Sequence, residues 1–174
     1  TPSNKWKASI EDKDKREDFV YDTIPADPKA IWKYLGRGVS DEISTPAKQN
    51  IILIRLADIM LLRAEALNKI GGTANKAEAL GLLNTIRTRA GLPVFDSEDD
   101  AIAMYGDLES AILHERSVEL CFEGHRWFDL VRTGKAISTM GPINGLSSEA
   151  NLVWPIHQNS LNKNPNLVQN PFYQ

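Results

Sequence analysis

The sequence predicts a mainly α-helical fold, and three observations support this. Two segments, at about residues 54–70 and 76–90, repeat apolar residues with the spacing of a helix face, and a third helical pattern covers about residues 108–123. A short helix from about 126 to 133 follows it. Most of residues 1–50 and 135–174 is weakly periodic or rich in Gly, Asn, Ser and Pro, which favours irregular structure. We therefore expect helices joined by long ordered loops and no large sheet.

The first helix is apolar on nearly every side. Leu56, Ile59, Met60, Leu67 and Ile70 repeat at the i, i+3 and i+4 spacing, and further apolar side chains, including Leu61 and Leu62, fill the positions between them. Small residues at Ala57 and Ala64 would let a neighbouring helix approach closely. A helix with this pattern has to be covered on several sides. Gly71 and Gly72 are expected to end it.

The second helix has a start signal and a stop signal. Asn75 is a candidate N-cap, with Glu78 at the capping-box position, and Gly91 followed by Pro93 ends the pattern. The short connection predicts an antiparallel pair of helices. Its size and small residues are those of one tetratricopeptide-like unit, which cannot bury both of its faces alone.

The length of 174 residues fits one domain. Within a single domain over residues 1–174 we expect an irregular segment at 1–50, a helical core at 51–134 and a coil-rich closing segment at 135–174. The chain starts at Thr1 without an initiator Met or a leader sequence. We therefore expect a piece of a longer chain.

Composition excludes several classes of function. The net charge is -3 and no basic stripe is present, so nucleic acid is not an expected partner. No run approaches the roughly 20 apolar residues that cross a bilayer. Cys121 is the single cysteine, which excludes an intrachain disulfide and a cysteine metal site. We expect it in the core.

Four motifs follow one another over about residues 50–174. The most specific continues into Val131-Arg132-Thr133-Gly134 and reads Glu115-Arg116-Ser117-Val118-Glu119-Leu120-Cys121-Phe122-Glu123-Gly124-His125-Arg126-Trp127-Phe128-Asp129-Leu130. The others are residues 55–68, residues 83–93, and Trp154-Pro155-Ile156 with residues 164–171. In this order they resemble the SusD/RagB family: its alanine–glutamate–alanine helix at 55–68, the helix after it at 83–93, its signature at 115–134 and its C-terminus at 154–171. His157 and Phe172 stand where the family often has Pro and Gly.

The resemblance implies a helical fold built on tetratricopeptide-like pairs and a role in nutrient uptake. Family members are lipoproteins of the Bacteroidetes outer membrane, exposed at the cell surface. They bind oligosaccharides or polysaccharides, in some cases peptides, for a SusC-like TonB-dependent transporter, and do not cleave them. A lipid anchor at the N-terminus, absent from this sequence, would hold the full-length protein. The alternative is a tetratricopeptide-like interaction scaffold without a small-molecule ligand.

The carboxylates of the signature invite a catalytic or metal-binding interpretation, which their spacing does not favour. His114 and His125 lack the Glu-x-x-His offset of carboxylate-bundle metal sites. A glycosidase needs a second carboxylate across a cleft, and the sequence identifies no candidate for it. Glu115, Glu119 and Glu123 fall one turn apart on one face of the expected helix and share it with apolar residues, so we expect them to be buried in ion pairs, Glu119 with at least one arginine. The available partners are Arg63, Arg87, Arg89, Arg116 and Arg126. The predicted structural signature comprises Glu115, Arg116, Glu119, Glu123, Arg126 and Asp129. No catalytic residue, metal or cofactor is predicted.

Sugar binding would use aromatic faces flanked by polar groups. Trp32, Tyr34 and Trp6 are the candidate ligand-binding residues, because they lie in the weakly periodic first 50 residues beside Asn4, Asp27 and Lys33. Aromatic residues in such a segment also commonly fix loops to a core. Trp127, Phe128 and Trp154 are expected to be core residues.

Overall fold

The computed structural model describes residues 4–17, 33 and 52–174, and these form two compact units, 1–124 and 125–174. Helices dominate both units, and none of the described residues lies in a strand, which confirms the predicted mainly helical fold. Compact units are not the same as independently folding domains, so the single domain over residues 1–174 stays a prediction. Trp32 and Tyr34 lie outside the described residues.

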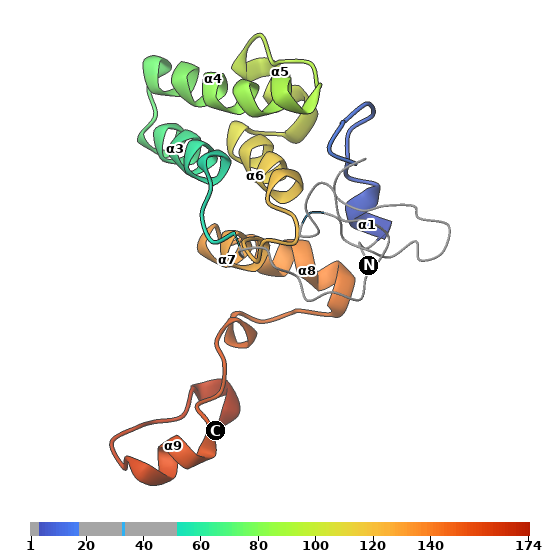
Figure 1. Ribbon diagram of the computed structural model, residues 1–174. Coiled ribbons are helices and arrows are strands. Elements are labelled where there is room, and N and C mark those ends of the chain that lie inside the picture. The colour runs from blue at the N-terminus through green and yellow to red at the C-terminus, as the bar shows by residue number, and fades with distance from the viewer. Residues whose placement is uncertain (1–3, 18–32, 34–51) are drawn as a thin grey trace, which may run out of the picture. The chain divides into compact units, whose positions relative to one another are not determined.

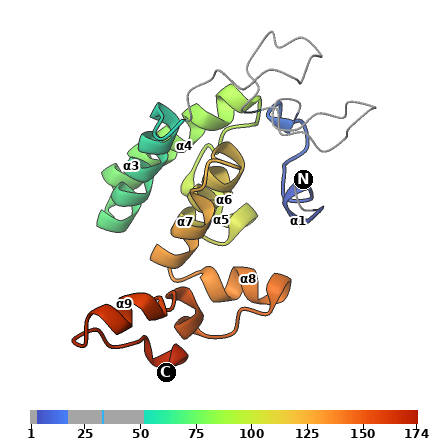
Figure 2. The same cartoon turned by 60° about the horizontal axis from the view of Figure 1, so that its bottom comes forward.

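The first unit is built on the predicted helix pair. α3 (Leu56–Ile70) and α4 (Thr73–Ala90) run side by side in opposite directions, as Figures 1 and 2 both show. α6 (Leu108–Glu119) packs on both helices, and α5 (Glu98–Tyr105) packs on α6 and α4. The side chains fully enclosed between these helices include Leu61, Ala64, Ala79, Leu83, Ala101 and Ile112.

α4 begins differently from the prediction. Gly71 and Gly72 both have positive φ, and the tight turn they form lets the helix start at Thr73. Asn75 therefore lies inside the first turn and donates from Nδ2 to the carbonyl of Gly71 at 2.7 Å. Glu78 pairs with Arg63 at 2.5 Å instead of completing a capping box. The predicted N-cap at Asn75 was wrong because two glycines made an earlier start possible.

α3 buries only part of its apolar surface within the described residues. α3 buries Ala57, Leu61 and Ala64 against its neighbours, whereas Leu56 is 75% exposed and Ile70 73% exposed. Small side chains on the inner face allow close packing, as expected. Of the large side chains that repeat with helical spacing, Met60 and Leu67 pack against the core, whereas Leu56, Ile59 and Ile70 are exposed.

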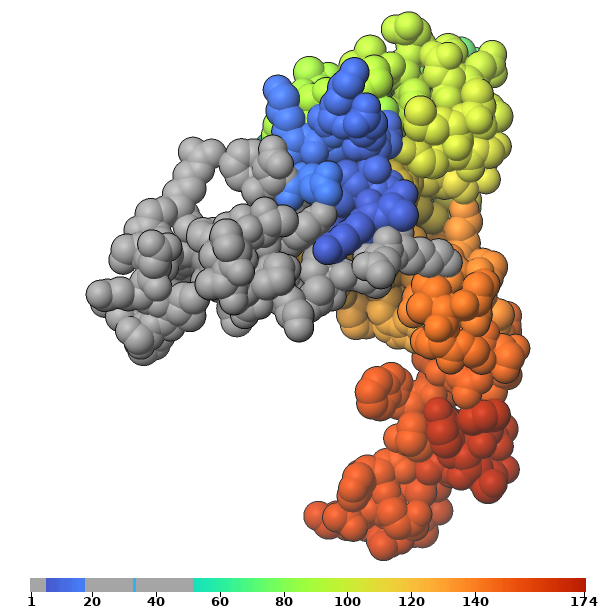
Figure 3. Space-filling view, turned by 90° about the vertical axis from the view of Figure 1, so that its right-hand side faces the viewer, coloured from blue at the N-terminus to red at the C-terminus, as the bar shows by residue number. Residues whose placement is uncertain are grey.

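An N-terminal segment lies against this helical core. It begins with the short helix α1 (Asn4–Lys7) and continues to residue 17, shown in blue in Figure 3 against the green and yellow-green atoms of the core. The amide of Lys15 donates to the carbonyl of Ala90 at 2.9 Å. A Cβ on Gly91, which has φ +81° at the end of α4, would come within 2.9 Å of the Lys15 side chain. Glycine thus serves both the helix end and the close contact.

α6 ends at Glu119, earlier than the predicted end near residue 123. Leu120 leaves the helical conformation, and Phe122 and Gly124 both have positive φ, which makes the turn that follows. Its apolar side chains stay inside: Cys121 is buried, as predicted, and packs with Trp6, Ile10 and Phe122. The rings of Trp6 and Phe122 meet edge to face at 5.5 Å. This packing holds Phe122 in a conformation that non-glycine residues rarely adopt.

The second unit is more helical than predicted. α7 (Arg126–Arg132) packs on α8 (Ala136–Asn144), and the closing segment adds η2 (Glu149–Leu152), α9 (Gln158–Lys163) and η3 (Pro171–Tyr173). The expectation of mostly irregular structure over 135–174 was therefore wrong. α8 includes Pro142, which lacks the amide hydrogen that would bond to the preceding turn, and the helix ends two residues later at Asn144.

Two aromatic residues of this unit are not in the core. Phe128 is 70% exposed and Trp154 is 81% exposed, contrary to the core positions expected for them, while Trp127 is half-buried. α7 turns Leu130 and Asp129 inward, which places Phe128 on its outer side.

The inner face of α3 generates a stability prediction. Leu61→Ala should lower the free energy of unfolding by about 2–5 kcal/mol, because it leaves a cavity in a fully enclosed site. Leu56→Ala on the same helix should change it by no more than about 0.5 kcal/mol, since that side chain is mostly exposed. Urea denaturation of both variants checks this. Equal losses would contradict the assignment of the inner face.

Candidate functional site: a buried carboxylate cluster and an aromatic cavity

Three carboxylates converge at the C-terminal end of α6. Glu115 and Glu119 lie one turn apart on the helix, and the turn after α6 brings Glu123 to the same place. Their side chains are 1%, 3% and 1% exposed. Burying three anionic groups together is strongly unfavourable unless each meets a cation and hydrogen-bond donors. The positions of the basic side chains around these carboxylates therefore determine the geometry of the site.

Arg16, in the N-terminal segment, bridges the first two carboxylates. Its Nη1 atom lies 2.5 Å from Oε1 of Glu115 and 3.1 Å from Oε2 of Glu119, and its Nη2 atom lies 2.6 Å from Asp14. Asp14 in turn accepts a hydrogen bond from the amide of Arg16 at 2.9 Å, which fixes the local turn. The guanidinium thus ties residues 14–16 to α6.

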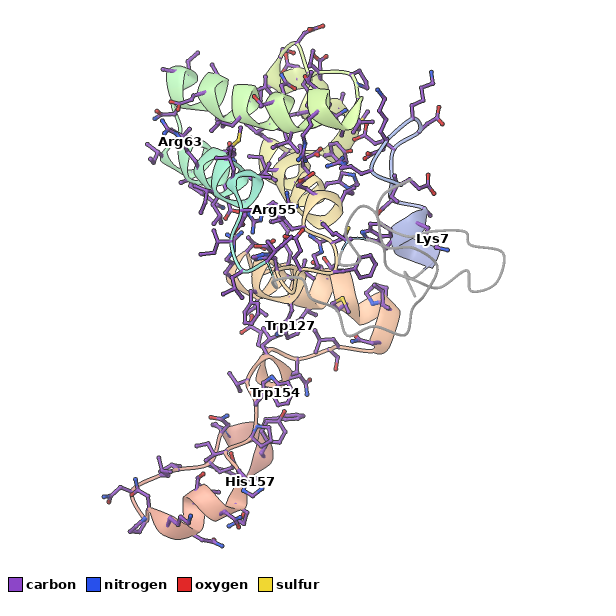
Figure 4. All side chains as sticks on the ribbon, in the orientation of Figure 1. Lys7, Arg55, Arg63, Trp127, Trp154 and His157 are labelled. Carbon is purple, nitrogen blue, oxygen red and sulfur yellow. The ribbon has the colours of Figure 1, made fainter. Side chains whose placement is uncertain are left out.

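Arg55 and Lys33 occupy the other end of the cluster. Arg55, which Figure 4 labels at the start of α3, pairs with Glu123 at 2.9 Å and also with Glu119. The Nζ atom of Lys33 lies 2.5 Å from Glu123 and donates to the carbonyls of Glu119 at 2.6 Å and Cys121 at 3.1 Å. Arg89, from the last turn of α4, completes the set by pairing with Glu119.

A second group of polar side chains adjoins the cluster. Arg87 is fully buried and pairs with Glu11 at 2.5 Å, while its guanidinium lies 4.1 Å from the centre of the Phe95 ring. The hydroxyl of Tyr105 donates to Glu11 at 2.7 Å. Arg87 also reaches Glu115 at 3.7 Å, so the two groups are continuous.

The cations and burial shift the pKa values of these acids in different directions. Burial alone would raise the pKa of Glu119, but hydrogen bonds from Arg89 and Arg55 outweigh it and lower the pKa to about 2. The same balance, with burial opposed by Arg55 and Lys33, lowers the pKa of Glu123. Burial dominates at Glu115 and raises its pKa despite Arg16. Glu119 is therefore the carboxylate whose charge the cluster stabilises most clearly.

The residues of the predicted signature take part in several separate contacts and do not form one cluster. Arg87 and Arg89 do reach the glutamates, but Arg116 pairs with Asp58 at 2.9 Å inside the helical core. Arg126 and Asp129 lie on α7 in the second unit, where Asp129 pairs with Arg132 at 2.7 Å. The burial of Glu119 and its pairing with an arginine, expected from helical spacing, are confirmed.

Sequence reasoning missed Arg16, Lys33 and Arg55 as partners of the glutamates. They lie 64 to 103 residues away from those acids in the chain. Helical periodicity relates only residues a few positions apart, so it gives no signal for contacts of this kind. A search of the whole sequence for basic partners would have returned these three residues together with many other basic residues.

The arrangement is one of charge neutralisation. Guanidinium and ammonium groups lie around the carboxylates and form charge-assisted hydrogen bonds with them. Within residues 4–17, 33 and 52–174, no three His, Cys, Asp or Glu side chains are placed to hold a metal ion. The described contacts of the glutamates are ion pairs and hydrogen bonds to other parts of the chain.

Of the three candidate ligand-binding aromatics, only Trp6 is described. Its indole N–H donates to the carbonyl of Ser117 at 3.2 Å, and its ring contacts Phe122. These contacts account for Trp6 as an attachment of the N-terminal segment to α6. A ligand-binding role for Trp6 stays a prediction.

The second unit contains an open, aromatic cavity of about 420 Å³. Figure 4 labels two of its tryptophans, Trp127 on α7 and Trp154 after η2. Asp129 holds the Arg132 guanidinium beside them through hydrogen bonds of 3.1 and 2.7 Å. The lining residues are Trp127, Phe128, Val131, Arg132, Leu152 and Trp154. Flat apolar rings next to a fixed cationic donor are suited to a ligand with both apolar and hydroxylated faces.

A second hollow, of about 490 Å³, lies where the α3–α4 turn meets the start of α5. It has no aromatic lining, and an ion pair between Lys76 and Glu98 at 2.7 Å crosses it. It offers less to a ligand than the aromatic cavity does.

Comparison with known proteins shows the family. The model of the SusD family matches residues 4–173, and the chain belongs to this family. It is 47% identical to SusD-like protein P38 of Formosa agariphila over 82% of the chain, which spans 28% of that relative's length.

Two solved structures resemble this fold. One is surface glycan-binding protein A from Bacteroides uniformis, with 25% identity and a TM-score of 0.74 over 97% of this chain and 40% of that one. The other is a laminarin-binding SusD-like protein, with 33% identity and a TM-score of 0.59 over 83% of this chain and 27% of that one. Among the described residues, no helix has the length and apolarity to cross a membrane.

The carboxylate cluster predicts a large loss of stability when its central member is removed. Glu119→Ala removes one partner from the largely buried guanidinium groups of Arg16 and Arg55 and should cost about 3–5 kcal/mol of unfolding free energy. Glu78→Ala is the matched control, because its pair with Arg63 is exposed and worth about 0–1 kcal/mol. Thermal and urea denaturation of both variants measure the difference. A Glu119→Ala protein as stable as the control would show that the cluster is not structural.

The lowered pKa of Glu119 also predicts acid sensitivity. Its folded pKa of about 2 lies below the ordinary value of 4.5, so its contribution is fully present above pH 4.5. That contribution should be lost as the pH falls from 4.5 towards 2, because the unfolded chain then binds the proton more readily. Urea denaturation across this range should show a smaller fall in stability for Glu119→Gln than for the wild type. Identical pH profiles would contradict the assignment.

Proposed function

We propose that this protein is a non-catalytic, glycan-binding subunit of a nutrient-uptake complex. Membership of the SusD family supports the class of function, since family members are generally binding proteins. Two structural neighbours are named for glycan or laminarin binding. The observation within this chain that carries the proposal is the exposed aromatic cavity of the second unit, since the buried carboxylates are already neutralised.

The partners follow from the resemblance to the family. The protein would capture an oligosaccharide or polysaccharide, or in some members a peptide, and pass it to a SusC-like TonB-dependent transporter. It would act at the cell surface of a Bacteroidetes bacterium, attached to the outer membrane through an N-terminal lipid anchor of the full-length protein. No cofactor and no nucleic acid enters this function.

The chemistry of a sugar fits the cavity. One face of a pyranose ring carries C–H groups that pack on an aromatic ring, and its hydroxyls require hydrogen-bond donors and acceptors. Trp154 and Phe128 present such faces, and Arg132 presents donors held in place by Asp129. Trp32 and Tyr34, which lie outside the described residues, remain proposed ligand contacts of the N-terminal part.

A second candidate function is a tetratricopeptide-like interaction scaffold. It is favoured by the exposed aliphatic side chains on and just before α3, which suit a protein partner better than a sugar because they have no ring face. They are Leu53, Ile54, Leu56, Ile59 and Ile70. A lipoprotein signal in the full-length precursor would favour the glycan-binding function over this scaffold.

Calorimetric titration with a panel of polysaccharides that includes laminarin tests the glycan-binding proposal. Trp154→Ala and Phe128→Ala should each weaken binding about tenfold, which corresponds to about 1.4 kcal/mol. Phe172→Ala is the control, because Phe172 is an exposed aromatic residue of the same unit that does not line the cavity. No reducing ends should be released. Hydrolysis of any glycan would contradict the non-catalytic part of the proposal. Binding that both cavity variants leave unchanged would contradict the assignment of the binding site to this cavity.

A further inference from the structure

The aromatic cavity of the second unit has two walls of different kinds. Four of its six lining residues lie on α7, whose backbone is hydrogen-bonded within the helix. The other two are Leu152, the last residue of η2, and Trp154, which follows Val153 in extended backbone at φ -106° and ψ 147°. Extended backbone makes no hydrogen bonds of its own, so its N–H and C=O groups need partners from elsewhere in the chain. The second wall therefore depends on residues that do not line the cavity.

Gln169 supplies the first of these partners. Its Oε1 atom accepts from the amide of Ile156 at 2.8 Å, and its Nε2 atom donates to the carbonyl of the same residue at 2.9 Å. One side-chain amide thus bonds to both backbone groups of one residue, as a neighbouring antiparallel strand would. The Oε1 atom also accepts from the amide of Asn170 at 2.9 Å, so the side chain of Gln169 is itself held in place.

Two further contacts hold the backbone on the other side of Ile156. Asn170 donates from Nδ2 to the carbonyl of Trp154, and the hydroxyl of Tyr173 donates to the carbonyl of Val153 at 3.2 Å. Pro155 restricts the chain between these contacts, because its ring fixes φ. The backbone is therefore held before, at and after the residue that carries the exposed indole.

The indole of Trp154 depends on this support more than an enclosed ring would. Trp154 is 81% exposed, whereas Trp6 is half-buried and is fixed by its own contacts with Ser117 and Phe122. Most of the surface of Trp154 touches no other part of its unit, so the position of its ring follows mainly from its backbone. A group that is ordered before its ligand arrives loses less conformational entropy on binding.

We propose that Gln169 and Asn170 are positioning residues that hold Trp154 at the aromatic cavity. They do not line the cavity and act through the backbone of residues 154–156. This role rests on the proposed glycan-binding function, which it extends by explaining how an exposed ring is ordered before a sugar packs on it. Gln169 is the better residue to change, because one substitution removes three hydrogen bonds.

A double-mutant cycle between Gln169 and Trp154 tests this role. Calorimetry with laminarin, starch, xylan and pectin first identifies a glycan that binds the wild type. Gln169→Ala should weaken that binding about fivefold, because the ring then has to be ordered on binding. In a Trp154→Ala background the same change should weaken binding less than about twofold, because the ring that Gln169 positions is gone. Gln169→Glu keeps the shape and the acceptor but cannot donate to the Ile156 carbonyl, so it should behave like Gln169→Ala.

Gln158→Ala is the matched control. Gln158 is an amide side chain of the same unit that bonds to Asn162 at 2.9 Å within α9 and does not line the cavity. This variant should bind the glycan as the wild type does. Should Gln169→Ala fail to fold, Asn170→Ala takes its place in the cycle, because it removes the bond to the Trp154 carbonyl.

The outcomes separate this role from the proposed function. A loss of equal size with and without the Trp154 ring would show a general effect on the fold and would overturn the positioning role. So would unchanged binding by Gln169→Ala when Trp154→Ala weakens it, and both results would leave the glycan-binding function standing. A wild type that binds none of the glycans would overturn both.

Discussion

The burial of three carboxylates at one end of α6 is the constraint on which the rest of the first unit depends. A buried anion without a partner would cost more than a domain can spare, so the chain has to bring cations to it. Within the described residues, five acids of this region pair with five bases, so their formal charges balance. The acids are Glu11, Asp14, Glu115, Glu119 and Glu123, and the bases are Arg16, Lys33, Arg55, Arg87 and Arg89.

The cluster also explains how an irregular N-terminal segment acquires a fixed place. A helix as short as α1 is not stable in isolation, and residues 8–17 have few apolar anchors of their own. Ion pairs from Arg16 and Glu11, together with the packing of Trp6 on Phe122, attach the segment to the helical core. The positive φ of Phe122 belongs to the same arrangement, because the turn that requires it also brings Glu123 to Lys33 and Arg55.

Sequence patterns predicted those features that depend on neighbouring residues. Helical periodicity located the α3–α4 pair, and the one-turn spacing of Glu115 and Glu119 predicted their common face. The features that were missed depend on distant residues. Periodicity shows that α3 is apolar on several sides, but it does not reveal that Leu61 is enclosed while Leu56 is exposed. In the same way, it could not select Arg16 or Lys33 as partners of residues on α6.

The glutamates of the family signature are buried in this chain, which bears on how the signature should be interpreted. Its acidic residues are dense enough to suggest catalysis, yet in this chain they are enclosed, neutralised and bonded to the backbone of α6 through shared cations. A general acid or a nucleophile needs access to a substrate, which these groups lack. Accessible chemistry instead lies with rings such as Trp154 and with the fixed Arg132. In this chain the charge of these residues is used in contacts between parts of the chain, and the proposed recognition would fall to residues outside the cluster.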